Sequence, residues 1–344
     1  MMTPRAKSQR PDLTGPPAKM GEPRQGIIAF IDKNRRALSA LLVFAAMMLV
    51  FIILGPSTFL NPLIYMAIFR TLPIPIILTS SLVFVIVEGE IDLSFGSIVG
   101  LTTWAFAATA VAGWNPFLSM VFALVVGGCT GFLNGVIVTR LGLSSLVSTL
   151  GMSFLLRGLI HVGTQGNGIS LTFLNDTPFY NASVGSVWGF PVHMIWGLAF
   201  AAVAMLLFNY HRFGVHICCV GDNPQSSREM GINVAGVKTL AFIYVGIASG
   251  MAGVLSGLNN QMFYPGSGDD LLLPVLAATF VGGTPTWGGV GTVVGAVIGA
   301  CSVGVIEAGI VAAGVSHLYK NFFYGLIIIL AVGGHRLNEP QYRI

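Results

Sequence analysis

Long runs of apolar residues, separated by shorter polar stretches, dominate the sequence from Ala37 onward. A helix needs about 20 apolar residues to cross the hydrocarbon core of a bilayer. The pattern therefore predicts an all-α polytopic membrane protein of about ten transmembrane helices, of which the eighth and tenth are short for a full crossing. The ten runs are Ala37–Leu54, Leu63–Val87, Gly96–Ala112, Pro116–Thr139, Ser144–Val162, His193–Asn209, Thr239–Leu258, Leu271–Gly282, Gly288–Ala312 and Asn321–Val332.

Prolines inside two of these runs predict broken or kinked helices. Pro73 and Pro75 interrupt the second run, and Pro274 interrupts the eighth. Membrane helices tolerate such breaks where neighbouring helices or water satisfy the freed backbone groups. Some of the predicted spans are therefore expected to be irregular.

The composition agrees with a membrane protein. Of the 344 residues, 54% are hydrophobic and only 9% are charged, against about 25% charged in soluble proteins. The formal net charge of +4 does not indicate a nucleic-acid partner, because many of the basic residues crowd the N-terminal tail. The four cysteines lack the spacing of metal ligands, so no metal site is expected.

The basic residues also predict an orientation. With ten crossings, both termini lie on one side of the membrane. All but three of the 17 lysines and arginines then fall in tails and loops on that side, the exceptions being Arg70, Arg157 and Lys320. The positive-inside rule makes this side cytoplasmic. We expect a disordered basic cytoplasmic tail at 1–36, a transmembrane domain at 37–334 with an external loop at 163–192, and a cytoplasmic C-terminal tail at 335–344.

A polar segment of mixed charge at 210–238 interrupts the apolar pattern on the cytoplasmic side. Asn223 and Pro224 are typical of a helix cap and a first helical residue, and Gly231 is typical of a helix end. A short surface helix is therefore expected from Gln225 to Met230. Such a helix between two spans can bind a soluble partner, and a solvated connector is the alternative.

Three acidic residues cluster where the second run ends, and charged groups near spans are functional candidates by default. They are Glu88, Glu90 and Asp92, and they precede Ser94 and Gly96 at the start of the third run. Asp92 or Ser94 can cap the third helix. Because three acids cannot all be caps, a gate or conformational latch is the alternative.

Two more charged residues lie inside apolar runs. Glu307 has small residues around it in the ninth run and is expected to face a water-filled path or a partner helix rather than lipid. Arg157 in the fifth run is a candidate partner for Glu307. The sequence contains no P-loop and no zinc-protease or serine-hydrolase motif, so the chain is not expected to hydrolyse ATP or to be an enzyme.

Several short motifs occur in a specific order between about Phe59 and Gly333. They are Asn61–Arg70, Gly89–Ser97, Asn134-Gly135, Ser148–Gly151 with Arg157-Gly158, Arg212–Asn233 and Gly282–Thr292. Together they resemble the permease subunit of bacterial ABC importers of the ribose/simple-sugar type, within the branched-chain amino acid/ribose permease superfamily. Ser227-Arg228 and Leu272-Leu273-Pro274 depart from the usual family pattern, which indicates a subgroup and weakens any assignment of ribose as the solute.

The resemblance implies a type II ABC importer-like architecture in the bacterial inner membrane. The chain would form, with a second permease copy or paralogue, the path for a small polar solute such as a sugar or polyol. A separate ATPase subunit would bind ATP and Mg, so the chain itself would need no cofactor. A periplasmic binding protein would deliver the solute to the periplasmic side, where the loop 163–192 lies. The segment 210–238 would dock into the ATPase through Gly221, Asp222, Asn223, Arg228, Glu229 and Gly231.

Other functions remain open at this stage. Related permeases carry branched-chain amino acids or nucleosides. A self-sufficient secondary transporter or channel would need ionisable residues near several span midpoints, and the chain has few. The candidate translocation and gating residues are Glu90, Asp92, Ser94, Gly96, Arg157 and Glu307.

Overall fold

The structure is a computed structural model that describes residues 27–312, 316 and 319–338. The chain divides into two units, residues 1–35 and 36–344. The described part of the first unit consists of the opening residues of helix α1 (Ile27–Leu54). Residues 27–36 are therefore helical, and the expectation that they are disordered is wrong, since neither Gly nor Pro stops the helix before Leu54. The remaining tail residues, 1–26 and 339–344, lie outside the described part.

Six described helices are long and apolar enough to cross a membrane, or seven if a bent pair counts as one span. Each of the ten apolar runs contains a helix, but a count of ten spans is not confirmed. The long helices are α1, α6 (Pro116–Arg140), α7 (Ser145–Thr164), α9 (Val192–Tyr210), α12 (Val234–Asn259) and α14 (Val293–Ala312), and the bent pair is α3 (Pro62–Thr71) with α4 (Pro73–Val87). The shorter apolar helices are α5 (Phe95–Val111), α13 (Leu272–Val281) and α15 (Lys320–Asn338).

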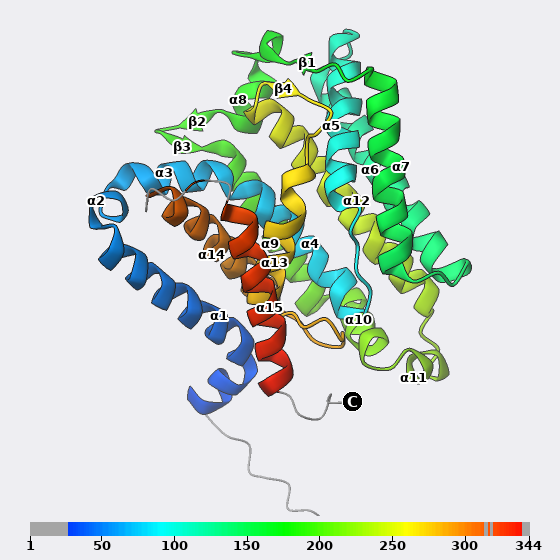
Figure 1. Ribbon diagram of the computed structural model, residues 1–344. Helices are drawn as coiled ribbons and strands as arrows, with labels where there is room; N and C mark the ends of the chain where they lie inside the picture. The colour runs from blue at the N-terminus through cyan, green and yellow to red at the C-terminus, as the bar shows by residue number, and fades with distance from the viewer. Residues whose placement is uncertain (1–26, 313–315, 317–318, 339–344) are drawn as a thin grey trace, which may run out of the picture. The chain divides into compact units, whose positions relative to one another are not determined.

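Helix α4 forms the centre of the second unit (Figure 1). Nearly all of its side chains are buried, as expected for a helix that is apolar on every side. It packs against α9, α12, α13 and α14, and α12 packs in turn against α5 and α6. Phe84 of α4 contacts the rings of Phe208, Phe213 and Tyr244. A break at the start of α4 therefore lies against several other helices.

Short elements connect the long helices. β1 (Ile169–Ser170) pairs antiparallel with β4 (Met262–Phe263), so that Ile169 faces Phe263. β2 (Ser186–Val187) and β3 (Phe190–Pro191) form a hairpin in which Ser186 faces Pro191. The other short elements are α2 (Pro56–Phe59), η1 (Thr172–Leu174), α8 (Pro178–Val184), α10 (Arg212–Asp222), α11 (Pro224–Glu229) and η2 (Asp269–Leu271).

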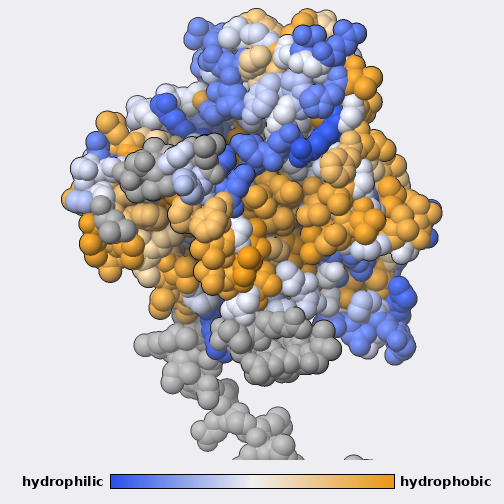
Figure 2. Space-filling view, viewed as in Figure 1, coloured by the Kyte–Doolittle hydropathy of each residue, from blue (hydrophilic) through white to orange (hydrophobic). Residues whose placement is uncertain are grey.

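The surface of the second unit separates into apolar and polar zones. On the face that Figure 2 shows, an apolar band crosses the helices, with hydrophilic surface above it near β1 and β4 and below it near α11. The segments expected on opposite sides of the membrane, 163–192 and 210–238, thus lie at opposite ends of the helices (Figure 1). Segment 210–238 is more regular than expected, because Arg212–Asp222 forms the helix α10 rather than a loop.

Candidate functional site

The break between α3 and α4 exposes backbone groups inside the second unit. The two helices meet at Leu72 with a bend of 50°. Pro73 has no N–H group to continue the hydrogen bonds of α3, so a break is expected at this position. His193, buried near the start of α9, has its Nε2 atom 3.0 Å from the carbonyl oxygen of Arg70, and an N–H at this atom donates to that carbonyl. The sequence prediction of a broken second helix is confirmed.

A polar cavity of about 220 Å³ lies beside this break. Its walls come from the α3–α4 junction, the end of α12, the loop that follows β4, and α13, α14 and α15. A cavity of this size is smaller than the roughly 300–1,000 Å³ of sites for drug-sized ligands, so it suits a small solute. The polar lining residues are Arg70, Thr71, Ser256, Asn259, Asn260, Tyr264, Asp270, Glu307, Lys320 and Tyr324.

The charges in the cavity wall balance. Arg70 and Lys320 are formally positive, and Asp270 and Glu307 are formally negative. Such a lining offers hydrogen-bond donors and acceptors without selecting a net charge. A small polar solute without net charge therefore fits this wall best.

Sequence reasoning identified only Glu307 among these charged residues. A signal for the others was present, because Arg70, Arg157 and Lys320 are the basic residues that do not fit the cytoplasmic charge pattern. Two of these three line the cavity. The cavity itself was not predictable, because its wall combines five separate stretches of the chain.

Glu307 lines two cavities rather than one. Besides the polar cavity, it borders a second, mostly apolar cavity of about 440 Å³ with Thr71 and Gly304. Glu307 therefore faces open cavities, and the expectation that these belong to a path stays a prediction. Its suggested partner was wrong, however, since Arg157 pairs with a different carboxylate.

Arg157 forms an ion pair with Asp269, and their Nη1 and Oδ2 atoms are 3.0 Å apart. Asp269 directly precedes Asp270 of the cavity wall. Partial burial raises the pKa of the Asp269 carboxyl from its ordinary value, and the Arg157 charge opposes this shift. The pair links the middle of α7 to the loop that borders the cavity.

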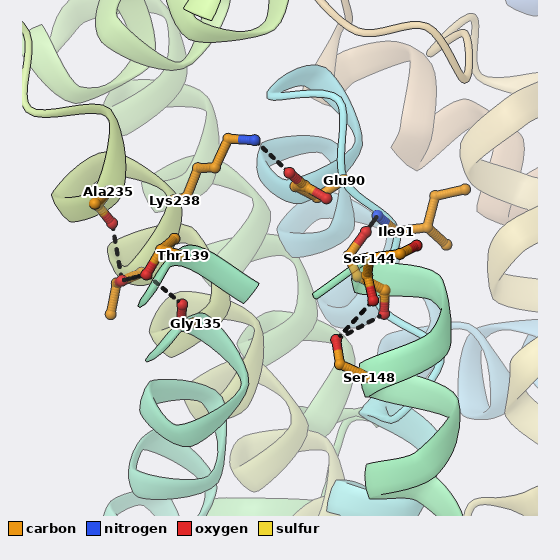
Figure 3. A network of polar contacts seen from close by, with 10 residues as sticks. Glu90, Ile91, Gly135, Thr139, Ser144, Ser148, Ala235 and Lys238 are labelled. Atoms are coloured by element: carbon orange, nitrogen blue, oxygen red, sulfur yellow. Dashed lines mark hydrogen bonds and ion pairs between the residues drawn. The ribbon is translucent and has the colours of Figure 1, made fainter. Parts of the chain in front are cut away.

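The three acids after α4 have three different environments. Glu90 forms an ion pair with Lys238 of α12 (Figure 3). Asp92 is fully buried, and its Oδ1 accepts hydrogen bonds from the backbone N–H and the hydroxyl of Ser94, both at 2.7 Å. Glu88 is buried at the end of α4. Of the two caps considered, Asp92 is the one that accepts a bond at the start of α5, while Ser94 makes no side-chain cap bond.

Two further contacts fix the start of α5. Asn134 of α6 donates from Nδ2 to the Ser94 hydroxyl at 2.7 Å. Gly96 packs directly against the backbone of Gly268, and a Cβ atom at Gly96 would lie 2.7 Å from the Gly268 carbonyl oxygen. Gly268 lines the polar cavity. The start of α5 is thus in backbone contact with the cavity wall.

The short surface helix predicted after Asn223 is confirmed. Asn223 caps α11, because its Oδ1 accepts from the N–H groups of Gln225 and Ser226 at 3.0 Å. Gly231 has a left-handed backbone with φ of 83°, and the following N–H bonds back to the Ser227 carbonyl at 3.0 Å, which closes a Schellman motif. Arg228 and Glu229 are exposed on this helix, as are Asp222 and Asn223 beside it.

The α10–α11 segment is attached to the end of α4. Gly221 lies so close to the Val87 carbonyl that any side chain there would overlap it. The same carbonyl accepts a hydrogen bond of 2.7 Å from the N–H of Gly289, in the loop between α13 and α14. A movement of the α10–α11 segment can therefore reach α4, and the loop before α14, through backbone contacts at Gly221, Val87 and Gly289.

Comparison with known proteins shows transport permeases. Residues 64–332 match the family described as branched-chain amino acid transport system / permease component. The D-allose transport system permease protein of Escherichia coli (strain K12) is 32% identical over 299 residues, which cover 86% of this chain and 90% of that protein. The ribose import permease protein of the same strain is 31% identical over 258 residues, 74% of this chain and 80% of that protein.

A third relative is an autoinducer 2 import system permease protein of Yersinia enterocolitica serotype O:8 / biotype 1B. It is 30% identical over 302 residues, which cover 87% of this chain and 82% of that protein. No solved structure matches the chain. These relatives are transport proteins rather than enzymes, which confirms the expectation that the chain is a permease. Within the described residues, no group of three or more His, Cys, Asp or Glu side chains is placed to hold a metal ion.

Proposed function

The chain belongs to the family of branched-chain amino acid transport system permease components, and on this basis we propose that it forms, with a second permease, the membrane path of an ATP-driven importer for a sugar or polyol. A separate ATPase subunit supplies the ATP hydrolysis, and a periplasmic binding protein delivers the solute. The protein lies in the bacterial inner membrane, with α11 and both termini on the cytoplasmic side.

The polar cavity beside the α3–α4 break carries this proposal. Its wall combines hydroxyl, amide and charged groups and has no formal net charge among its four ionisable acids and bases. Sugars present many hydroxyls, which both donate and accept hydrogen bonds. Transporter sites commonly lie where membrane helices are interrupted, because freed backbone groups can then face a cavity.

The relatives favour a sugar over an amino acid. One is named for import of ribose and another for transport of D-allose. A branched-chain amino acid remains the second candidate, since the family description names it and a zwitterion also has no net charge. The wall also contains apolar side chains such as Leu72, Ile74 and Val303, so the names of the relatives rather than the lining favour a sugar.

The exposed helix α11 supports an ATPase partner on the cytoplasmic side. It is capped at both ends and presents Arg228 and Glu229 to solvent. Gly221 and the Val87 carbonyl connect it to the buried helix α4. A partner that moves α11 can therefore act on the helix whose first turn borders the cavity.

Uptake by the purified complex tests the proposal. The chain is purified with its co-purifying ATPase subunit and binding protein and reconstituted into liposomes. Radiolabelled D-ribose, D-allose and L-leucine are then offered with and without ATP. We expect ATP-dependent accumulation of a sugar and none of leucine. Uptake without ATP would identify a self-sufficient transporter instead, and accumulation of leucine alone would overturn the assignment of a sugar-type solute.

A further inference from the structure

One face of α7 carries a row of polar side chains at every fourth position. They are Ser145, Thr149, Ser153 and Arg157. Residues four apart lie above one another on a helix, so the four form a stripe about 18 Å long. Each of them contacts the segment that leads from α4 into the first turn of α5.

The first half of the stripe, Ser145 and Thr149, holds the non-helical backbone between α4 and α5. The Ser145 hydroxyl accepts from the N–H of Ile91 at 3.1 Å. The Thr149 hydroxyl accepts from the N–H of Leu93 at 3.0 Å. Two residues of an extended chain span at most about 6.6 Å, and four helical residues rise about 6.0 Å. Backbone N–H groups two residues apart can therefore meet hydroxyls four residues apart on α7.

The second half of the stripe continues to the cavity. Ser153 and Ser97 share a hydrogen bond of 2.7 Å between their hydroxyls, and Arg157 donates from Nε to the Ser97 hydroxyl at 3.0 Å. Arg157 also pairs with Asp269, beside the cavity wall. The stripe thus connects the end of α4 to the loop that borders the cavity.

Thr149 is the most constrained member of the stripe. Its side chain is fully buried, and its hydroxyl proton is within reach of the carbonyl oxygens of Ser145 at 2.7 Å and Ile91 at 3.3 Å. Leu93 is half-buried, and without this hydroxyl its N–H loses the acceptor that the structure gives it. A backbone donor that loses its partner away from bulk water is costly. Leu93 lies three residues before Gly96, which packs against Gly268 of the cavity wall.

We propose that Thr149 is a positioning residue for transport, whose hydroxyl holds the non-helical segment from Ile91 to Leu93 in register on α7 and thereby holds Gly96 against the cavity wall at Gly268. Thr149 itself does not line the cavity. The proposal rests on the proposed function in that it takes the cavity to be part of the solute path.

The first test compares transport by hydroxyl variants in the reconstituted complex. Thr149→Val keeps the shape of the side chain and removes the acceptor. We expect its uptake of D-ribose or D-allose, whichever the wild type accumulates, to fall about tenfold at limiting sugar, which corresponds to ~1.4 kcal/mol. Thr149→Ser keeps the hydroxyl and should restore uptake to within about twofold of wild type.

Ser148→Ala is the matched control. Among the described residues, the Ser148 hydroxyl donates only to the carbonyls of Ser144 and Ser145 in its own helix, so its loss should leave uptake unchanged. The proposal is overturned if folded Thr149→Val transports like wild type, or if Thr149→Ser is as impaired as Thr149→Val. Should Thr149→Val fail to accumulate in the membrane, Thr149→Cys replaces it, because a thiol is only a weak hydrogen-bonding group.

A second measurement does not depend on the solute. Hydrogen exchange of the peptide covering residues 88–95 reports whether the Leu93 N–H is protected. We expect faster exchange in Thr149→Val than in wild type and Ser148→Ala. Unchanged exchange would overturn the positioning role even if neither sugar is transported, whereas failure of wild-type uptake alone would count against the proposed solute.

Discussion

Asp92, Ser94 and Asn134 form one buried polar group at the start of α5. The Ser94 hydroxyl donates to Asp92 and accepts from Asn134. The second oxygen of Asp92 and the amide oxygen of Asn134 are buried without a hydrogen-bond partner among the described residues. The group thus holds the start of α5 and still has unused acceptors. Substitutions of Asp92 can therefore separate its role as a helix cap from a role that needs its charge.

We predict that Asp92→Asn folds and transports within about twofold of wild type, because asparagine caps a helix about as well as aspartate. Asp92→Ala should lower stability by about 0.5–2 kcal/mol. Thermal unfolding in detergent measures the stability, and uptake measures the function. Lost transport in a well-folded Asp92→Asn protein would instead indicate a latch that depends on the charge.

The ion pair of Arg157 and Asp269 is expected to contribute little to the free energy of unfolding, although it connects α7 to the loop beside the cavity. Its side chains are 32% and 43% exposed, and ion pairs of this kind contribute about 0.2–1 kcal/mol. We predict that a double-mutant cycle with Arg157→Gln and Asp269→Asn, measured by unfolding in detergent, gives a coupling energy of about 1 kcal/mol or less. A coupling of several kcal/mol would show that the pair is desolvated in the assembled complex.

For single residues, the sequence indicated which charged side chains need a partner but not which residues those partners are. Glu90, Asp92 and Arg157 were identifiable because a charge near an apolar run requires compensation. Their partners Lys238, Ser94 and Asp269 were identifiable only where they are close in sequence, as Ser94 is. Contacts between distant segments depend on helix packing, which the local pattern does not encode.

Among the elements, α11 was predicted most completely. Its cap, first proline and closing glycine are all local signals, and the structure has each of them at the expected position. Helix α10 was missed although its buried residues Gly214, Ile217 and Val220 recur at helical spacing, because the charged residues around them favoured a polar connector between two spans. The break before α4 was predicted because proline removes a donor regardless of the surroundings.

We predict that Arg228→Glu inserts normally but loses the co-purifying ATPase and solute-stimulated ATP hydrolysis. Reversing an interface charge sets like charges against each other at a cost of several kcal/mol. Arg140→Glu is the control, because Arg140 is exposed at the end of α6 and lies outside α11. If Arg228→Glu keeps the ATPase and transports as the control does, α11 does not dock through Arg228.

At the scale of the second unit, the apolar band on the face shown in Figure 2 separates two polar ends. This arrangement follows from composition, since a long apolar run avoids water and a charged loop avoids lipid. The sequence could therefore predict that the protein is an all-α polytopic membrane protein. It could not predict the number of full spans, because α5, α13 and α15 are apolar yet short.

The orientation is open to a direct labelling test. In a variant without the four native cysteines, we predict that an impermeant thiol reagent added outside intact cells modifies Ser186→Cys but not Gln225→Cys. Both positions are exposed, at opposite ends of the helices. After the cells are opened, Gln225→Cys should also react. The reverse pattern would place α11 outside and rule out its docking to a cytoplasmic ATPase.

Blocking the polar cavity tests the central claim most directly. Asn259→Cys, in the same cysteine-free background, places one thiol in the cavity wall, and Ser186→Cys serves as the control outside it. We predict that a thiol reagent abolishes ATP-dependent sugar uptake by the reconstituted Asn259→Cys complex, that the transported sugar slows this modification, and that the modified control remains active. Full uptake after complete modification of the cysteine at position 259 would contradict the assignment of this cavity to the solute path.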